Sequence, residues 1–303
     1  MKRGTPKFPC IGKLCSRKGK PVKIVGISAG KRGKLDCARE DPVSLYYLKL
    51  ALKHAEKSGA ETQLIDLRDL KIGACKECYS TCPAQCRFDE KKFQCDCYQW
   101  KEDYLMINDD AVPIEKAYDI LDKKKFFETY HDEGRFAEKD DMWIVYKAMM
   151  EADGIIFATA TNFYGRPALL QTMLSRFTAL DGGVEELWGD GKNLKNSVKY
   201  AKNSKAEYKQ RLFGKWCAFI NCSKEGDAVT PNLMKACTMM GMKILPFAVA
   251  YRVNWYDDPT HRKDAVKSKK DKYTLSLVEH IGTEIVRRIK KDTRVYGIVS
   301  STV

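Results

Sequence analysis

The sequence has no long hydrophobic run, and this absence excludes several classes of protein. No stretch of eighteen consecutive apolar residues occurs in the 303 positions, so a membrane-spanning helix is not expected. Residues 1–23 are basic and contain prolines, but they lack the apolar core of a signal peptide. We therefore expect a soluble, cytoplasmic protein with no membrane partner.

Signatures of nucleic-acid binding are missing as well, although the charge would suit such a role. Lysine and arginine number 54 against 40 aspartates and glutamates, which gives a net charge of +14. An excess of this size attracts polyanions. The basic residues are scattered among acidic ones, and no zinc-finger, helix-turn-helix or aromatic RNA-binding pattern accompanies them. The simpler interpretation is a solvated surface, and nucleic acid is not the expected partner.

Histidine is scarce. The four histidines, at positions 54, 131, 261 and 280, form no recognisable arrangement with a cysteine or a carboxylate. We therefore nominate no catalytic acid, base or nucleophile from the protein.

Cysteine, by contrast, is abundant and concentrated. Six of the twelve cysteines lie within residues 75–97. Thiolates packed this densely are either disulfides or soft ligands for zinc or an iron–sulfur cluster, and a reducing compartment favours the metal. We interpret the segment as a metal or cluster site. Among the other cysteines, Cys217 lies in a predicted strand, where burial in the core is the simpler role, and Cys37 and Cys237 are also predicted to be structural.

Strands and helices alternate along the chain. Short β-branched runs predict strands over 22–28, 62–67, 154–160, 215–221 and 243–249, and helical patterns cover 41–57, 140–152, 168–180, 230–240 and 274–291. Such alternation predicts an α/β fold with a five-stranded parallel sheet and helices on both faces. We expect a basic arm over 1–21 and one domain over 22–303. Within that domain, a cysteine-rich insertion with helical periodicity at 111–130 covers about 75–138, and a surface excursion covers about 181–213.

The loop after the first predicted strand can bind an anion. Residues 28–34 are small, glycine-bearing and basic, and a helix follows them, so backbone N–H groups and positive charge are available. The loop has neither the P-loop lysine pattern nor the spacing of a Rossmann fingerprint. An ordinary solvated turn at Lys31 and Arg32 is the alternative. In parallel sheets, ligands bind at the carboxyl ends of the strands, where the loops after strands one, three and four meet.

Taken together, these stretches resemble the NADPH-dependent FMN reductases, a flavodoxin-like family, and most closely its iron–sulfur flavoproteins. The resemblance covers about residues 22–250 without 79–138 and 181–213. It rests on Gly26-Ile27-Ser28 and its loop, Cys75-x2-Cys78, Asp140-Asp141-Met142, Ala152 to Ile156, and the frame of Ala160, Phe163-Tyr164-Gly165, Pro167 and Ser175-Arg176.

The resemblance implies a flavodoxin-like, doubly wound sheet that holds FMN in three loops beside a 4Fe-4S cluster. A flavin exchanges two electrons or one, whereas a cluster passes only one, so the pair would convert between the two modes. The implied FMN residues are Ser28, Gly30, Lys31, Arg32 and Gly33; Ala160, Thr161, Asn162, Phe163, Tyr164 and Gly165; and Asn221, Cys222, Ser223 and Gly226.

The implied cluster ligands are Cys75, Cys78, Cys82 and Cys86. Two departures from the family pattern leave the fourth ligand open among Cys86, Cys95 and Cys97: the gap before Cys82 is one residue longer, and no cysteine closely precedes Asp140. The phosphate loop also differs, because it reads Ser28-Ala29-Gly30-Lys31-Arg32 in place of Ser-Pro-Arg. An anion site survives this change, but the family's individual contacts do not carry over.

The expected function is an iron–sulfur flavoprotein oxidoreductase, assembled as a homodimer or homotetramer, with NAD(P)H or a ferredoxin-type protein as electron donor. Two alternatives stay open. One is a zinc-stabilised flavodoxin-like module that binds a polyanion such as nucleic acid. The other is a flavin-dependent reductase with structural zinc. Phe163 and Tyr164 would be core aromatics if they did not face a flavin.

Overall fold

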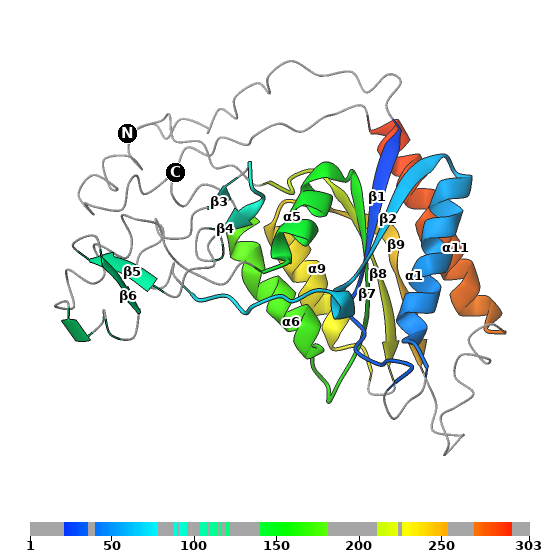
Figure 1. The fold of residues 1–303 in the computed structure, drawn as a ribbon. Helices are drawn as coiled ribbons and strands as arrows, with labels where there is room; N and C mark the ends of the chain where they lie inside the picture. The colour runs from blue at the N-terminus through cyan, green and yellow to red at the C-terminus, as the bar shows by residue number, and fades with distance from the viewer. Residues whose placement is uncertain are drawn as a thin grey trace, which may run out of the picture.

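A parallel sheet with helices on both faces forms the centre of the molecule (Figure 1). The computed structural model describes residues 21–35, 40–77, 88–89, 91–95, 98, 104–107, 110–113, 116, 119–120, 140–180, 211–223, 226–253 and 270–292. The predicted α/β architecture is confirmed within these residues.

The five strands of the sheet are β1 (Val22–Ser28), β2 (Ala60–Asp66), β7 (Gly154–Ala160), β8 (Trp216–Ser223) and β9 (Lys243–Val253). They lie in the order β2-β1-β7-β8-β9, and every neighbouring pair is parallel. This is the doubly wound order of flavodoxin-like folds, in which the switch point lies between β1 and the next strand toward the other edge. Here the carboxyl ends of β1 and β7 flank that point.

Burial on both faces of the sheet explains why the sequences of the central strands are continuously apolar. Ile24 on β1, Ile155 on β7 and Phe219 on β8 are each at most 1% exposed. Helices cover both faces of a doubly wound parallel sheet, so side chains of both orientations along these strands are buried. The short β-branched runs in the sequence are therefore the result of burial on both faces of the sheet.

Helices α1 (Val43–Lys57) and α11 (Lys272–Lys291) cover one face of the sheet, and α5 (Met142–Glu151), α6 (Ala168–Ser175) and α9 (Val229–Met239) cover the other (Figure 1). Gly282 of α11 lies so close to α1 that a Cβ atom there would overlap the carbonyl oxygen of Ala51. No helix in the described part of the chain is long and apolar enough to cross a membrane.

Three sequence predictions need correction. The predicted helix 168–180 ends as an α-helix at Ser175 and continues as the 3-10 helix η4 (Arg176–Leu180). Residues 111–113, predicted to be helical, belong to strand β6 (Asp110–Pro113), which pairs with β5 (Tyr104–Ile107). The surface excursion predicted to reach 213 ends earlier, because Leu212 is fully buried.

Little of the predicted cysteine-rich insertion can be compared with the structure. The described parts include the β5–β6 hairpin and a second short hairpin of β3 (Phe88–Asp89) and β4 (Gln94–Cys95). The rest of 78–138 and the predicted arm over 1–20 lie outside the described residues.

Candidate functional site

The loops predicted to hold a cofactor meet at one edge of the sheet. In the register of the strands, Ser28 of β1 lies opposite Ala158 of β7, and Ala160 lies opposite Cys222 of β8. The loops after β1, β7 and β8 therefore leave the sheet side by side, at its carboxyl edge. This arrangement brings together the three groups of residues named from the sequence.

Two buried hydroxyl groups, with no partner in the described part of the chain, flank the loop between β1 and α1, which we call the β1 loop. Ser28 is fully buried and Ser44, in the first turn of α1, is 1% exposed. Neither Oγ atom has a hydrogen-bond partner among the described residues. Buried polar groups in native proteins are almost always paired, so these two hydroxyls, one at the end of β1 and one in the first turn of α1, fit an anionic ligand. Ser44 was missed from the sequence, although its place just after Pro42, in the first turn of a helix, could have identified it.

Gly30 keeps this loop close to the start of α1. A Cβ atom at Gly30 would lie 2.6 Å from Pro42 Cβ and 3.2 Å from Ser44 Oγ. Such separations are too short for any larger residue. Glycine is therefore required here for close approach of the loop to the helix terminus.

Lys31 and Arg32, the two basic residues predicted to attract a phosphate, differ in whether their charge is available to a ligand. Lys31 is exposed and has no ion pair with any residue that the structure describes. Arg32 Nη1 donates to Glu40 Oε1 at 2.5 Å, so much of its charge is already compensated. Of the two basic residues predicted to attract a phosphate, Lys31 is the better placed to do so.

Two aromatic side chains project from a strained turn after β7. Asn162 and Gly165 exchange backbone hydrogen bonds of 2.9 Å, and Phe163 and Tyr164 between them have φ angles of 45° and 57°. Aromatic residues rarely adopt the left-handed region, and such strain is typical of functional loops. Phe163 is 88% and Tyr164 68% exposed. The alternative interpretation, that both are core aromatics, is therefore wrong.

The end of β8 supplies an amide and a capping carboxylate. Asn221 is fully buried, and its Nδ2 donates to Asp227 Oδ1 at 2.6 Å and to Thr161 Oγ1 at 3.3 Å. Asp227 Oδ1 also accepts from the backbone N–H of Thr230 and so caps α9. Asn221 Oδ1 and Thr230 Oγ1 have no partner within the described residues. An acceptor and a hydroxyl thus remain for a ligand at this side of the edge.

The other residues predicted to bind the cofactor from this side of the sheet lie at the end of β8 and in the loop after it. Cys222 and Ser223 are buried at the end of β8, and Gly226 adopts a φ of 83° with open space around it. Together the three loops offer a phosphate cradle, an aromatic surface and buried amide and hydroxyl groups. Those groups fit the phosphate, the ring face and the polar ring edge of FMN.

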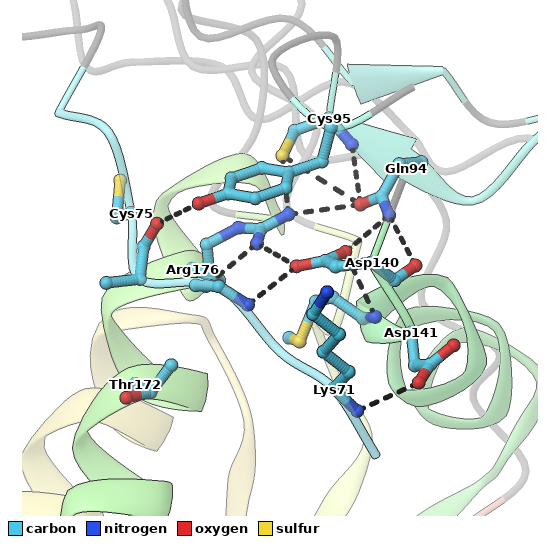
Figure 2. A network of polar contacts seen from close by, with 12 residues as sticks. Lys71, Cys75, Gln94, Cys95, Asp140, Asp141, Thr172 and Arg176 are labelled. Atoms are coloured by element: carbon cyan, nitrogen blue, oxygen red, sulfur yellow. Dashed lines mark hydrogen bonds and ion pairs between the residues drawn. The ribbon is translucent and has the colours of Figure 1, made fainter. Parts of the chain in front are cut away.

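A second cluster, which the sequence did not reveal, surrounds Arg176 (Figure 2). Arg176 is 2% exposed. Its Nη1 donates to Asp140 Oδ2 at 2.6 Å and to the Gly73 carbonyl at 3.0 Å, and its Nη2 donates to Gln94 Oε1 at 3.1 Å and to Cys95 Sγ at 2.8 Å. We call these five residues the Arg176 cluster.

Asp140 connects the same cluster to the rest of the fold. Its Oδ1 accepts from Gln94 Nε2 at 2.8 Å and from the Met142 N–H at 3.2 Å, and its Oδ2 accepts from the Gly73 N–H at 3.0 Å. Asp140 thereby accepts from the first backbone N–H of α5, whose N-cap residue Asp141 makes no side-chain capping hydrogen bond. Burial lowers the pKa of Arg176, but the neighbouring Tyr146, Cys95 and Asp140 raise it above its ordinary value. The guanidinium therefore stays charged.

The cysteines predicted to bind metal are only partly comparable with the structure. Cys75 and Cys95 lie among the described residues, whereas Cys78, Cys82, Cys86 and Cys97 lie outside them. The described residues contain no group of three or more potential metal ligands. Cys75 donates its backbone N–H to Ser175 Oγ at 3.2 Å, and Cys95 contacts Arg176. Both cysteines are thus anchored on consecutive residues at the end of α6.

Cys75 and Cys95 lie away from the FMN-binding loops. Helix α6 begins just after the aromatic turn and ends at Ser175, so its eight residues place the two ends about 12 Å apart. Figure 2 shows Cys75 and Cys95 with Arg176 at the second of these ends.

The other cysteines in the described residues are packed in the core. Cys217 of β8 and Cys237 of α9 are fully buried, as predicted for structural residues. A hydrogen bond with Cys217, together with burial, raises the pKa of the Cys237 thiol. Cys37 lies outside the described residues.

Comparison with known proteins finds one matching family model and solved structures with a similar fold. The model of the family described as NADPH-dependent FMN reductase matches residues 115–255. The structure of RosB with bound 8-demethyl-8-formylriboflavin-5'-phosphate has a TM-score of 0.53 and 15% identity, covering 90% of this chain and 82% of that one. This likeness supports the flavodoxin-like fold.

Two further solved structures are more distant. A flavone reductase has a TM-score of 0.46 and 17% identity, over 91% of this chain and 66% of that one. An azoreductase from Bacillus anthracis has a TM-score of 0.41 and 12% identity, over 88% and 99%. No curated protein matches the sequence.

Proposed function

We propose that the chain is a flavin-dependent oxidoreductase of the NADPH-dependent FMN reductase family, whose model matches residues 115–255, and that it oxidises a nicotinamide nucleotide with FMN held at the carboxyl edge of the sheet. We propose further that electrons leave one at a time through an iron–sulfur cluster held by the cysteines. FMN, when bound, supplies the hydride and single-electron chemistry. The protein residues bind and orient it.

One observation carries the flavin assignment. Two buried hydroxyls without partners, Ser28 and Ser44, lie at the same edge as two exposed aromatic side chains, Phe163 and Tyr164. In the proposed complex the hydroxyls and the N-terminus of α1 bind the flavin phosphate, and Lys31 adds positive charge. The aromatic pair covers the apolar ring face.

Asn221 would orient the ring. Its unpartnered Oδ1 can accept from a ring N–H, while Asp227 and Thr161 fix the amide from the other side. A buried acceptor left without a partner costs about 1–3 kcal/mol, which the ligand would recover. No protein acid or base is required by this proposal, because the reacting atoms belong to the flavin and the nicotinamide.

The test of the flavin proposal is binding of FMN to flavin-free protein, followed by reduction with NADPH or NADH under anaerobic conditions. Ser28→Ala combined with Ser44→Ala is expected to weaken FMN about tenfold or more and riboflavin, which lacks the phosphate, much less. A protein that binds neither flavin would overturn the proposal. If the double variant lost equal affinity for FMN and for riboflavin, Ser28 and Ser44 would not be ligands of the phosphate.

The cluster proposal rests on the cysteine spacing and on the anchoring of two cysteines at the end of α6, Cys75 by its backbone N–H and Cys95 by its thiol. Cys75, Cys78, Cys82 and Cys86 are the proposed ligands, with Cys95 and Cys97 as alternatives for the fourth. The position of Cys95, bonded to Arg176 beside the anchor of Cys75, supports its inclusion among the candidates. Hydrogen bonds to ligand sulfurs also tune the reduction potentials of such clusters.

Anaerobic purification with iron, zinc and FMN measured per chain tests the cluster proposal. About four irons per chain are expected for a 4Fe-4S cluster. Cys75→Ser should lose iron, and whichever of Cys86→Ser and Cys95→Ser removes the fourth ligand should lose iron as well. Cys217→Ser, which alters a packed core thiol, should keep its iron in the folded protein. Zinc without iron would instead support a flavin reductase with structural zinc. A colourless zinc protein would support the polyanion-binding module.

The partners remain proposals of the same kind. A nicotinamide nucleotide is the proposed donor, with a ferredoxin-type protein as the alternative, and the net charge of +14 would favour either negatively charged molecule. A homodimer or homotetramer is proposed, and sedimentation of the FMN-loaded protein tests it.

A further inference from the structure

Arg68 connects three elements around the β1 loop. It lies in the 3-10 helix η1 (Leu67–Asp69), directly after β2. Its Nη1 donates to the carbonyl oxygen of Arg32 at 2.7 Å and to Asp41 Oδ1 at 3.1 Å, and its Nη2 donates to Asp66 Oδ2 at 2.6 Å. Arg32 and Asp41 lie in the two described segments between β1 and α1, residues 29–35 and 40–42. One guanidinium therefore ties both arms of that loop to the end of β2.

These contacts show that Arg68 is not itself free to bind a phosphate. All three of its side-chain nitrogens donate to protein acceptors, since Nε also lies 3.0 Å from Asp66 Oδ2. The hydrogen bonds with Asp66 raise the pKa of Arg68 above its ordinary value. Any effect on a ligand must therefore pass through the groups that Arg68 holds.

The two carboxylates lie beside the proposed phosphate site. Asp66 of β2 is opposite Ser28 of β1 in the register of the sheet, so their backbones are about 5 Å apart. Asp41 precedes Ser44 by three residues. Without Arg68, Asp66 would lose this counter-charge and Asp41 would keep only the exposed Lys34, whose Nζ lies 3.7 Å from Asp41 Oδ2, so additional negative charge would lie beside a flavin phosphate that is itself a dianion. At such separations, repulsion between partly exposed charges is large enough to alter binding about five- to tenfold.

We propose that Arg68 is a positioning residue that makes the β1 loop selective for a phosphate-bearing flavin, by holding the loop closed and by neutralising Asp66 and Asp41. The inference rests on the proposed function, because it assumes that FMN binds at Ser28 and Ser44. It adds a residue that neither the motifs nor the loop sequence identifies.

The test compares FMN with riboflavin, which shares the ring and lacks the phosphate. Dissociation constants are measured with flavin-free protein by quenching of flavin fluorescence. Arg68→Ala is expected to raise the constant for FMN about five- to tenfold and to leave that for riboflavin within about twofold. Arg68→Lys keeps the charge but cannot make the same set of contacts, so a smaller selective loss is expected. Adding Asp41→Asn to Arg68→Ala should recover part of the FMN affinity.

Arg287→Ala is the matched control, since Arg287 is also ion-paired but lies on α11 with Glu284 as its partner. It should change neither constant. Equal weakening of FMN and riboflavin by Arg68→Ala would overturn the inference and leave the proposed function intact. A wild-type protein that binds no FMN would overturn the proposed function instead. If Arg68→Ala does not fold, Arg68→Lys decides: an unchanged ratio of the two constants overturns the inference.

Discussion

Arg176 and Asp140 form a buried ion pair that joins two helices and the cysteine-bearing hairpin. Arg176 Nη1 lies 2.6 Å from Asp140 Oδ2, and the side chains are 1% and 4% exposed. Arg176 follows α6, Asp140 precedes α5, and both contact Gln94 of β4. A buried charge is stable only when it is paired and its remaining hydrogen-bonding groups are satisfied. The Arg176 cluster meets that requirement almost completely, since Arg176 Nε alone among these groups has no partner within the described residues.

Arg176→Met should therefore be strongly destabilising. It leaves Asp140 buried without its counter-charge, a change that typically costs about 3–5 kcal/mol in the free energy of unfolding. Urea denaturation of the flavin-free protein measures the loss. Arg287→Met removes an arginine from an ion pair that solvent screens, and its loss should be clearly smaller. Similar losses in the two variants would contradict the assignment of Arg176 as the centre of a buried cluster.

The sequence predicts the sheet and its loops well because their signals are local. The apolar runs of β1, β7 and β8 and the glycine-bearing loops after them lie within short windows. The Arg176 cluster is not predictable in this way, since Arg176 is 103 residues from Gly73 and 36 from Asp140. One signal was available: an arginine within the otherwise apolar stretch after α6 must be either exposed or paired.

The native Asn162–Gly165 turn is expected to lower the stability of the protein and to strengthen FMN binding. Phe163→Asn combined with Tyr164→Gly gives the pair preferred in such turns, so the free energy of unfolding should rise by about 1 kcal/mol as left-handed strain is relieved. Loss of both aromatic faces should weaken FMN about tenfold. Urea denaturation and fluorescence quenching give the two quantities.

Phe247→Asn is the control for this turn. Phe247 has a φ of 53° and is 81% exposed on β9, but it belongs to none of the three loops. The substitution should relieve strain and leave FMN binding unchanged. If Phe247→Asn weakened FMN as much as the turn variant does, the aromatic pair would not be the flavin surface.

Gly30→Ala should disrupt the β1 loop. The new Cβ would lie 2.6 Å from Pro42 Cβ, so the loop must move away from α1 at a cost of about 1–3 kcal/mol. FMN affinity is expected to fall more than riboflavin affinity, because the shift separates Ser28 from Ser44. Gly165→Ala, whose Cβ would meet nothing closer than 3.6 Å, should cost far less stability. Equal stability of the two variants would show that Gly30 is not required for close approach.

The same distinction between local and distant signals applies to the candidate site. Ser28 ends β1, and Phe163 and Tyr164 lie in the loop that follows β7, so all three could be named from the sequence. The place of Ser44 in the first turn of a helix could have identified it, but Arg68 could not be assigned a role, because its importance depends on Asp66, which the sheet brings beside Ser28. The masking of Arg32 by Glu40 is likewise visible only in the folded chain.

Glu284 on α11 should contribute to stability in a pH-dependent manner. Hydrogen bonds from Arg287, and also from Arg288, lower the pKa of Glu284 to about 2. Because this value is below that of the unfolded chain, about 4.3, the ionised carboxylate stabilises the native state above pH 5 and that stabilisation disappears as the pH falls toward 2. Glu284→Gln should therefore lose stability at neutral pH and show a flatter decline in acid. Arg287→Gln with Arg288→Gln removes the partners of Glu284 and should also flatten the decline of stability in acid. Screening by 1 M salt should flatten this decline in part. Parallel acid limbs in the wild type and in Glu284→Gln, measured by urea denaturation between pH 2 and 7, would contradict this assignment.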